Sequence, residues 1–210
     1  NYSEALDFVN RSLIKNSHNM LARDLKAIIL GKLNLKQEAL SCLSENLEID
    51  PFDYLSSFEK SRLDPAAKSV FSQYLLNNPQ GIISIANDYA SCGCYDEAIE
   101  VLNLFPKEYP LIDYYKAYFL AKSGKLSASR EKLFTAAAAD PAYCFPNRIS
   151  DIVVLTYAMD ANPQDSKAPY YLGNFLYDKK RYDDARIAWK QSVLIDNQFP
   201  TVWRNLAIVY

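Results

Sequence analysis

Residues 166–199 constrain the fold of this chain more than any other stretch, because they place small or apolar residues at a fixed helical spacing. Counted from Ser166, positions 7, 8, 11, 17, 20, 24, 27 and 28 are Leu172, Gly173, Leu176, Tyr182, Ala185, Trp189, Ser192 and Val193. Two antiparallel helices in a 34-residue unit must touch at these positions. Such a unit cannot bury its apolar face alone, so the stretch predicts a stack of helix pairs.

The same frame recurs earlier in the chain. Residues 110–143 place Ala117 at position 8 and Leu133 at position 24, and residues 79–109 place Ala86 at position 8 and Ala98 at position 20. The second helix of residues 79–109 should end before Phe105-Pro106, because proline inside a helix removes a hydrogen bond and clashes with the preceding turn. The sequence therefore predicts an array of pairs with irregular members.

The frame divides residues 1–210 into one repeat region. The expected parts are a half unit at 1–19, units at 20–53, 54–78 (degenerate), 79–109 and 110–143, an extra helix within 144–165, a unit at 166–199 and a partial unit at 200–210. The extra helix, about 148–160, has no obvious partner of its own. Incomplete units at both ends predict a fragment of a longer array.

Strand signals are nearly absent, since no Asn-Gly or Asp-Gly hairpin turn occurs and only five glycines are present. We therefore expect an all-α fold of about 13 helices. The spacing in residues 166–199 resembles the tetratricopeptide repeat (TPR), a helix–turn–helix unit of 34 residues. This resemblance implies a solenoid of antiparallel helix pairs wound as a right-handed superhelix.

The resemblance also implies a concave groove, lined by positions 2, 5, 9, 12 and 13 of each first helix. The residues that this register selects are Asn87, Tyr114, Tyr118, Lys122, Lys167, Tyr170, Asn174, Tyr177 and Arg204. Tyrosine offers a rigid face with a hydroxyl, and asparagine both donates and accepts hydrogen bonds, so the lining suits an extended peptide or a partner helix. Alternatively, some of these tyrosines pack against the extra helix near residue 150.

A carboxylate clamp, which binds chaperone tails in some TPR domains, requires lysine at position 5 and asparagine at position 9. Asn174 matches position 9, but position 5 is Tyr170. The sequence therefore argues against the clamp and predicts a more general protein or peptide partner.

Composition excludes several other functions. The formal charge of −2 offers no basic field for nucleic acid, and no apolar run approaches the roughly 18 residues of a membrane span. One histidine, no phosphate-binding glycine loop and no nucleophile motif predict a chain that is not an enzyme and holds no metal or cofactor. We interpret Cys92-Gly93-Cys94 as a turn between helices. The compartment is left open.

A second resemblance covers mainly residues 144–210, with weaker similarity in DYASCGCYDEAIEVL and YYKAYFLA. These stretches resemble the carboxy-terminal region of large bacterial TPR proteins that carry an uncharacterised amino-terminal domain. It implies that any catalytic or carbohydrate-related activity lies in that missing domain. Two hypotheses follow: a non-catalytic scaffold that binds a partner in its groove, or an accessory region that docks on the missing domain or mediates self-association.

Overall fold

The computed structural model describes residues 1–67 and 78–209, and residues 68–77 and 210 lie outside the described part. Twelve α-helices and one 3-10 turn occur in it, and no strand, so the all-α prediction is confirmed for these residues. The helices are α1 (Tyr2–Lys15), α2 (Met20–Lys32), α3 (Lys36–Ile49), α4 (Tyr54–Leu63), α6 (Pro79–Ser91), α7 (Tyr95–Leu102), α8 (Pro110–Lys122), α9 (Leu126–Ala138), α10 (Ile149–Ala161), α11 (Lys167–Asp178), α12 (Tyr182–Ile195) and α13 (Pro200–Val209).

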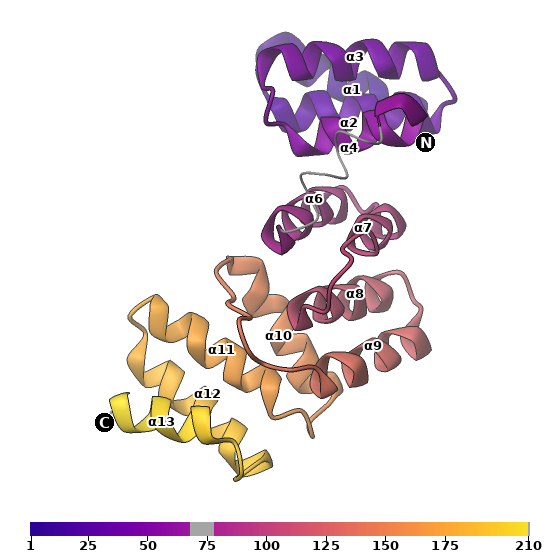
Figure 1. The fold of residues 1–210 in the computed structure, drawn as a ribbon. Coiled ribbons are helices and arrows are strands. Elements are labelled where there is room, and N and C mark those ends of the chain that lie inside the picture. The colour runs from indigo at the N-terminus through magenta and orange to yellow at the C-terminus, as the bar shows by residue number, and fades with distance from the viewer. Residues whose placement is uncertain (68–77, 210) are drawn as a thin grey trace. The chain divides into compact units, whose positions relative to one another are not determined.

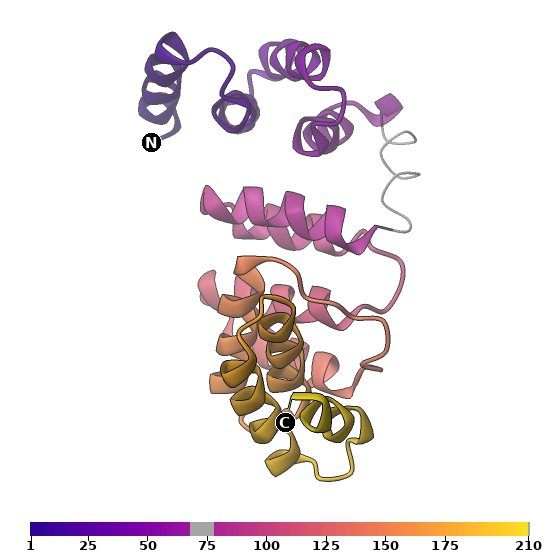
Figure 2. The same cartoon turned by 90° about the vertical axis from the view of Figure 1, so that its left-hand side faces the viewer.

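The chain forms two compact units, residues 1–93 and residues 94–210, which we call unit 1 and unit 2. Figures 1 and 2 show the helices of the chain from two sides. The boundary falls in the Cys92-Gly93-Cys94 turn, where Gly93 adopts a φ of 75°, a left-handed conformation that glycine accepts without strain. The division into repeats with the expected boundaries stays a prediction, and part of residues 54–78 lies outside the described residues.

Helix ends follow local signals in the sequence. The Asn19 side chain accepts a hydrogen bond from the Ala22 amide at the start of α2 (3.1 Å), and Pro110 occupies the first turn of α8, where its missing N–H costs nothing. Helix α7 ends at Leu102, before Phe105-Pro106, as the proline predicts. These signals lie within a few residues of the ends they set.

In unit 1, helices α2 and α3 form an antiparallel pair between α1 and α4. Ala27 and Leu30 of α2 pack against Ala39 and Leu43 of α3 in a small apolar core, and Leu6 of α1 packs against its edge. Small residues at positions 8 and 20 of the frame let the two helices approach closely, as the sequence predicts.

A buried polar cluster joins three helices of unit 1. Oδ1 of Asp24 in α2 accepts hydrogen bonds from Nδ2 of Asn46 in α3 (3.1 Å) and from the hydroxyl of Ser56 in α4 (2.6 Å). All three side chains are buried. Burial, and next the negative charge of Asp53, raise the pKa of Asp24 from 3.8 to about 8. Near neutral pH the folded chain therefore holds Asp24 largely as the uncharged acid.

This pKa shift predicts that unit 1 becomes less stable as the pH rises from about 4 to about 8. Across that window the unfolded chain loses a proton from Asp24 that the folded chain retains, so rising pH favours unfolding. The Asp24→Asn side chain stays neutral in both the folded and the unfolded state. Near pH 8 the free energy of unfolding of this variant should therefore be about 1–3 kcal/mol higher than that of the unchanged chain. Urea denaturation followed by far-UV circular dichroism at several pH values measures both effects.

The control for this experiment is Asp7→Asn in α1, whose exposed side chain lies 3.9 Å from Arg11. It should keep the pH dependence of the original chain. If Asp24→Asn kept the same pH dependence too, Asp24 would not be its source.

In unit 2, α8 pairs with α9 and α11 pairs with α12, while α10 packs against both α8 and α11 (Figure 1). The sequence indicated no partner for the extra helix, but in the structure α10 contacts both α8 and α11. Val154, Leu155 and Ala158 of α10 are buried. The apolar face of α10 is thus buried against its neighbours in unit 2.

Two adjacent tyrosines of α8 fix the starts of α10 and α11. The Tyr115 hydroxyl donates a hydrogen bond to Asp151 of α10 (2.6 Å), whose other oxygen accepts the amides of Asn147 and Arg148. The Tyr114 hydroxyl donates to Asp165 (2.6 Å), which also accepts the amide of Lys167 in α11. Both carboxylates are buried, so each is satisfied by a tyrosine and by backbone N–H groups.

A Tyr114→Phe substitution should destabilise unit 2 by about 1–3 kcal/mol, because it leaves the buried Asp165 carboxylate with one donor fewer. Native-state hydrogen exchange on α8 and α11 measures this loss as a lower free energy of opening. The matched control is Tyr143→Phe, because the Tyr143 side chain is 86% exposed. Equal protection of α11 in both variants would contradict the proposed role of the hydrogen bond.

Candidate interaction surface

Tyr170, Asn174 and Tyr177 share one face of α11, as their spacing of four and three residues requires. The Tyr170 ring packs against Phe199, with 4.8 Å between the ring centroids, and is buried. The Tyr177 ring lies 5.5 Å from the Trp189 ring and remains 37% exposed. The exposure of these three side chains therefore increases along α11, from the buried Tyr170 to the exposed Tyr177.

Asn174 is the polar centre of this face. Its Oδ1 accepts hydrogen bonds from Nε1 of Trp189 in α12 (3.2 Å) and from Nδ2 of Asn205 in α13 (3.1 Å). Arg204 in turn donates from Nη2 to Oδ1 of Asn205 (3.1 Å). This chain of hydrogen bonds holds α11, α12 and α13 in register. Both lone pairs of the Asn174 oxygen are used, so its amino group is what it can offer to a ligand.

We call Asn174, Tyr177, Arg204 and Asn205 the α11–α13 surface. Asn174 and Asn205 are half-buried, and Tyr177 and Arg204 are exposed. Trp189 supports the surface from beneath and is 2% exposed, as expected for position 24. The surface therefore combines a rigid aromatic base with hydrogen-bond donors at its rim.

The structure separates the other predicted groove residues from this surface. Tyr114 is completely buried against Tyr171 and Asp165, so it has no face for a ligand. Lys167 donates from Nζ to the backbone oxygen of Ala139. Both side chains are occupied by contacts within unit 2.

Tyr118 and Lys122 form a second small group on α8. The Tyr118 ring packs edge-on against Tyr157 of α10 (5.6 Å between centroids), and the Lys122 ammonium lies 5.3 Å from the Tyr118 ring centroid. The alternative that some of these tyrosines pack against the extra helix therefore describes Tyr118. Asn87 is half-buried on α6 of unit 1 and is described with that unit alone.

The sequence prediction did not include two residues near this surface. Asn205 supplies the link between α13 and α11, and Tyr182 lies with its ring 5.1 Å from that of Tyr177. Tyr182 was expected at a helix contact, and it makes one with Tyr177 of α11 while remaining 48% exposed. Its position at 17, the first residue of α12, is the signal that could have placed it beside the end of α11.

The one histidine of the sequence lies apart from any cluster of possible metal ligands in the described residues. His18 is exposed and shares a hydrogen bond with Ser17. No group of three or more His, Cys, Asp or Glu side chains that could hold a metal ion occurs in residues 1–67 and 78–209. Within the same residues, no helix has the length and apolar character needed to cross a membrane.

No protein-family model matches this chain, and no curated protein matches it either. Solved structures do match. The TPR protein YrrB, described as having an unusual peptide-binding site, is 16% identical over 96% of this chain and 81% of its own, with a TM-score of 0.30. A TPR protein of Thermus thermophilus is 16% identical, covering 99% of this chain and 90% of its own, with a TM-score of 0.29.

A tetratricopeptide repeat protein from Parabacteroides merdae is 11% identical over 99% of this chain and 92% of its own, with a TM-score of 0.34. Because these scores are low, the fold assignment depends on the register and contacts of the chain itself. Its helix pairs place small, buried residues at positions 8 and 20. The chain is an all-helical array of antiparallel helix pairs in the part that the structure describes.

The close approach of α11 and α12 depends on Gly173. A Cβ atom at residue 173 would overlap the indole ring of Trp189. Gly173→Ala should therefore destabilise α11 and α12 by about 1–3 kcal/mol, because Trp189 cannot move without leaving Asn174. Hydrogen exchange on these helices measures the change.

The matched control is Gly31→Ala near the end of α2, where an added Cβ meets nothing within 4 Å. This substitution should stabilise α2 by about 0.5–1 kcal/mol, because alanine loses less backbone freedom on folding. If Gly173→Ala left the stability of α11 and α12 unchanged, Trp189 would have moved to make room for the added Cβ atom. Its support of the α11–α13 surface would then not be rigid.

Proposed function

We propose that this chain is a non-catalytic protein-interaction scaffold, and that its α11–α13 surface binds an extended peptide or a helix of a partner protein. The observation that carries this proposal is Asn174, which is held between Trp189 and Asn205 with Tyr177 and Arg204 exposed beside it. Fixed aromatic and polar groups bind at low entropic cost, because they are already ordered before the ligand arrives.

The polar groups of this surface favour a particular ligand chemistry. Arg204 offers N–H donors, and the Asn174 oxygen is already used twice, which leaves the Asn174 amino group. Donors of this kind pair with peptide carbonyls or with side-chain carboxylates. A segment that presents oxygen atoms toward α11, with an apolar side chain over Tyr177, fits these features.

A peptide array with acidic and neutral peptides of about 15 residues would test this proposal, with the best binder measured by fluorescence anisotropy. Changing Tyr177 and Arg204 together to alanine should weaken its binding at least about tenfold, equal to about 1.4 kcal/mol. Tyr170 and Asn174 stay unchanged, because both support the fold.

The matched control changes Tyr143 and Arg130 to alanine, since both are exposed and neither belongs to the α11–α13 surface. Binding to this control should equal binding to the unchanged chain. Equal affinity for the Tyr177 and Arg204 variant, or no peptide bound above the background of a scrambled set, would overturn the assignment of this surface.

Self-association, which the sequence raised as part of the accessory hypothesis, stays a prediction. Docking on a missing amino-terminal domain stays a prediction, as does any carbohydrate-related role of a longer protein.

A further inference from the structure

Two carboxyl groups of unit 1 are bound by the same residue. The Ser56 hydroxyl donates a hydrogen bond to Oδ1 of Asp24 (2.6 Å), and the Ser56 amide donates to Oδ1 of Asp53 (3.2 Å). Asp24 belongs to α2, whereas Asp53 directly precedes α4 and caps it. One serine therefore brings the acids of two helices together, and we call Asp24 and Asp53 the carboxyl pair.

One oxygen of this pair needs a hydrogen-bond donor. Oδ1 of Asp53 accepts the amides of Leu55 (3.1 Å) and Ser56, but its Oδ2 is buried and accepts no hydrogen bond from the described residues. Oδ1 of Asp24 is already used by Asn46 and Ser56, which leaves its other oxygen to carry a proton. A protonated Asp24 is thus the donor that Asp53 needs, since a buried acceptor without a donor is destabilising.

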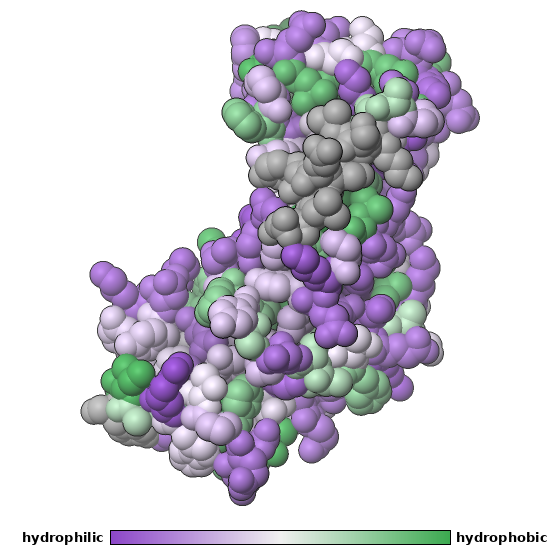
Figure 3. Space-filling model, viewed as in Figure 1, coloured by the Kyte–Doolittle hydropathy of each residue, from purple (hydrophilic) through white to green (hydrophobic). Residues whose placement is uncertain are grey.

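The carboxyl pair is not part of the outer surface. Over helices α1 to α4, polar and apolar residues are mixed on the face that the space-filling view shows (Figure 3). Asp24 is only 5% exposed, and Oδ2 of Asp53 is buried. Two ionised carboxylates would therefore lose much of their hydration here, at a high cost in free energy.

The cations near the pair are bound to other groups. Arg23 of α2 donates from Nε to Asn46 (2.7 Å) and from Nη2 to Glu45 of α3 (3.2 Å). Lys60 of α4 donates from Nζ to the Ser44 hydroxyl (3.2 Å). Neither cation is therefore placed to neutralise a second negative charge in the pair.

The remaining ionisable groups of the surrounding helices also lie elsewhere. Burial raises the pKa of the Cys42 thiol in α3, and the charge of Lys26 in α2 opposes that rise. Other charged groups have partners of their own, namely Glu59 with Arg62 and Tyr89, and Asp7 with Arg11. Those that are exposed to solvent are Glu4, Lys15, Lys32, Lys36, Glu38 and Glu48.

We propose that Asp24 and Asp53 share one proton, and that this proton attaches α4 to α2 and α3. While the proton is in place, the acid of α2 donates a hydrogen bond to the carboxylate at the start of α4. When the proton leaves, two negative charges face each other in a buried site, and α4 is released. Unit 1 thus contains a pH-sensitive switch.

Helix α4 is the element that responds, because its polar contacts converge on the pair. Ser56 of α4 binds both Asp24 and Asn46 (3.0 Å), so it links α4 to α2 and to α3. Helices α2 and α3 also hold each other through an apolar core that includes Ala27 and Leu43. Loss of the proton therefore weakens the attachment of α4 more than the α2–α3 pair.

The direction of the pH response follows from the protonation states. Burial, and next the charge of Asp53, raise the pKa of Asp24 to about 8, and a hydrogen bond to the Asp53 side chain adds to the rise. When α4 opens, Asp24 regains water and ionises near its ordinary pKa of 3.8. The open state thus loses a proton that the closed state retains, so rising pH favours opening between about pH 4 and pH 8.

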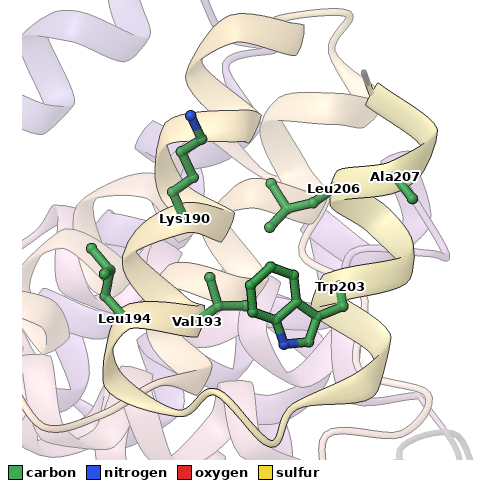
Figure 4. Close-up of a pocket in the computed structure, with 6 residues that line it drawn as sticks. All are labelled: Lys190, Val193, Leu194, Trp203, Leu206 and Ala207. Carbon is green, nitrogen blue, oxygen red and sulfur yellow. The ribbon is translucent and has the colours of Figure 1, made fainter.

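The groove between α12 and α13 in unit 2 offers no comparable pair. It has a volume of about 460 Å³ and is lined by Lys190, Val193, Leu194, Trp203, Leu206 and Ala207. Figure 4 shows the Lys190 ammonium directed away from Trp203. Lys190 is the one ionisable residue among these six, so no proton can be shared there.

Carbon-detected NMR of the aspartate carboxyl groups, from about pH 3 to about pH 9, tests the shared proton directly. A coupled pair titrates in two steps, and the carboxyl carbons of both Asp24 and Asp53 should shift in the upper step, near pH 8. Ionisation of Asp24 near pH 4 would overturn the proposal. An upper step seen at Asp24 alone would also overturn it.

Asp53→Asn separates the shared proton from burial alone. Asparagine caps a helix as well as aspartate does, and its amino group can donate to an ionised Asp24. The upper step should therefore fall by at least about one pH unit. If it stayed near pH 8, burial alone would keep Asp24 neutral and the proton would not be shared.

The matched control is Asp64→Asn at the other end of α4. Oδ1 of Asp64 accepts the Ala66 amide (3.0 Å), so this aspartate also caps a turn. The control should keep the upper step of the unchanged chain, and its loss would place the source of the step outside the carboxyl pair. Circular dichroism establishes that both variants are folded.

Hydrogen exchange, corrected for the intrinsic effect of pH, tests the release of α4. The opening constant of α4 amides should rise about tenfold per pH unit between about pH 5 and pH 7, and much less in Asp53→Asn. An equal rise in α2 and α3 would mean that the whole of unit 1 opens, which overturns the release of α4. Peptide binding should be unchanged in Asp53→Asn, because the α11–α13 surface belongs to unit 2.

Discussion

The arrangement of unit 2 depends on two adjacent hydroxyl groups of α8. Tyr115 holds the carboxylate at the start of α10, and Tyr114 holds the carboxylate just before α11. Each buried carboxylate also accepts backbone amides next to the first turn of its helix, so the hydrogen bonds fix where α10 and α11 begin relative to α8. Since α11 carries Asn174 and Tyr177, the α11–α13 surface depends on the hydrogen bond between Tyr114 and Asp165, which lie 51 residues apart in the sequence.

The helix pairs could be predicted from the sequence because their determinants are local. Small residues at positions 8 and 20 and a proline at a helix start act within one unit. The burial of Trp189 also follows from its position in the frame. The irregular helix α10 could be located by its apolar face, but its partner could not, because the frame contains no position for an inserted helix.

The site was predicted less completely, for physical reasons that particular residues show. Tyr114 occupies a groove position of the frame, but its hydroxyl donates to Asp165 and its side chain is completely buried. Asn174 was expected to donate and accept, but Trp189 and Asn205 occupy its oxygen. The Asp24 cluster joins side chains 10 to 32 residues apart, a separation that helical periodicity does not report.

The two tryptophans of this chain lie in contrasting surroundings. Trp189 is 2% exposed beneath Tyr177, whereas Trp203 is 50% exposed in the groove between α12 and α13. A buried indole emits at shorter wavelength than a hydrated one, so the blue and red edges of one emission spectrum report on different faces. The chain thus carries two intrinsic optical probes, and a ligand over Tyr177 and a ligand beside Trp203 would leave different spectral signatures.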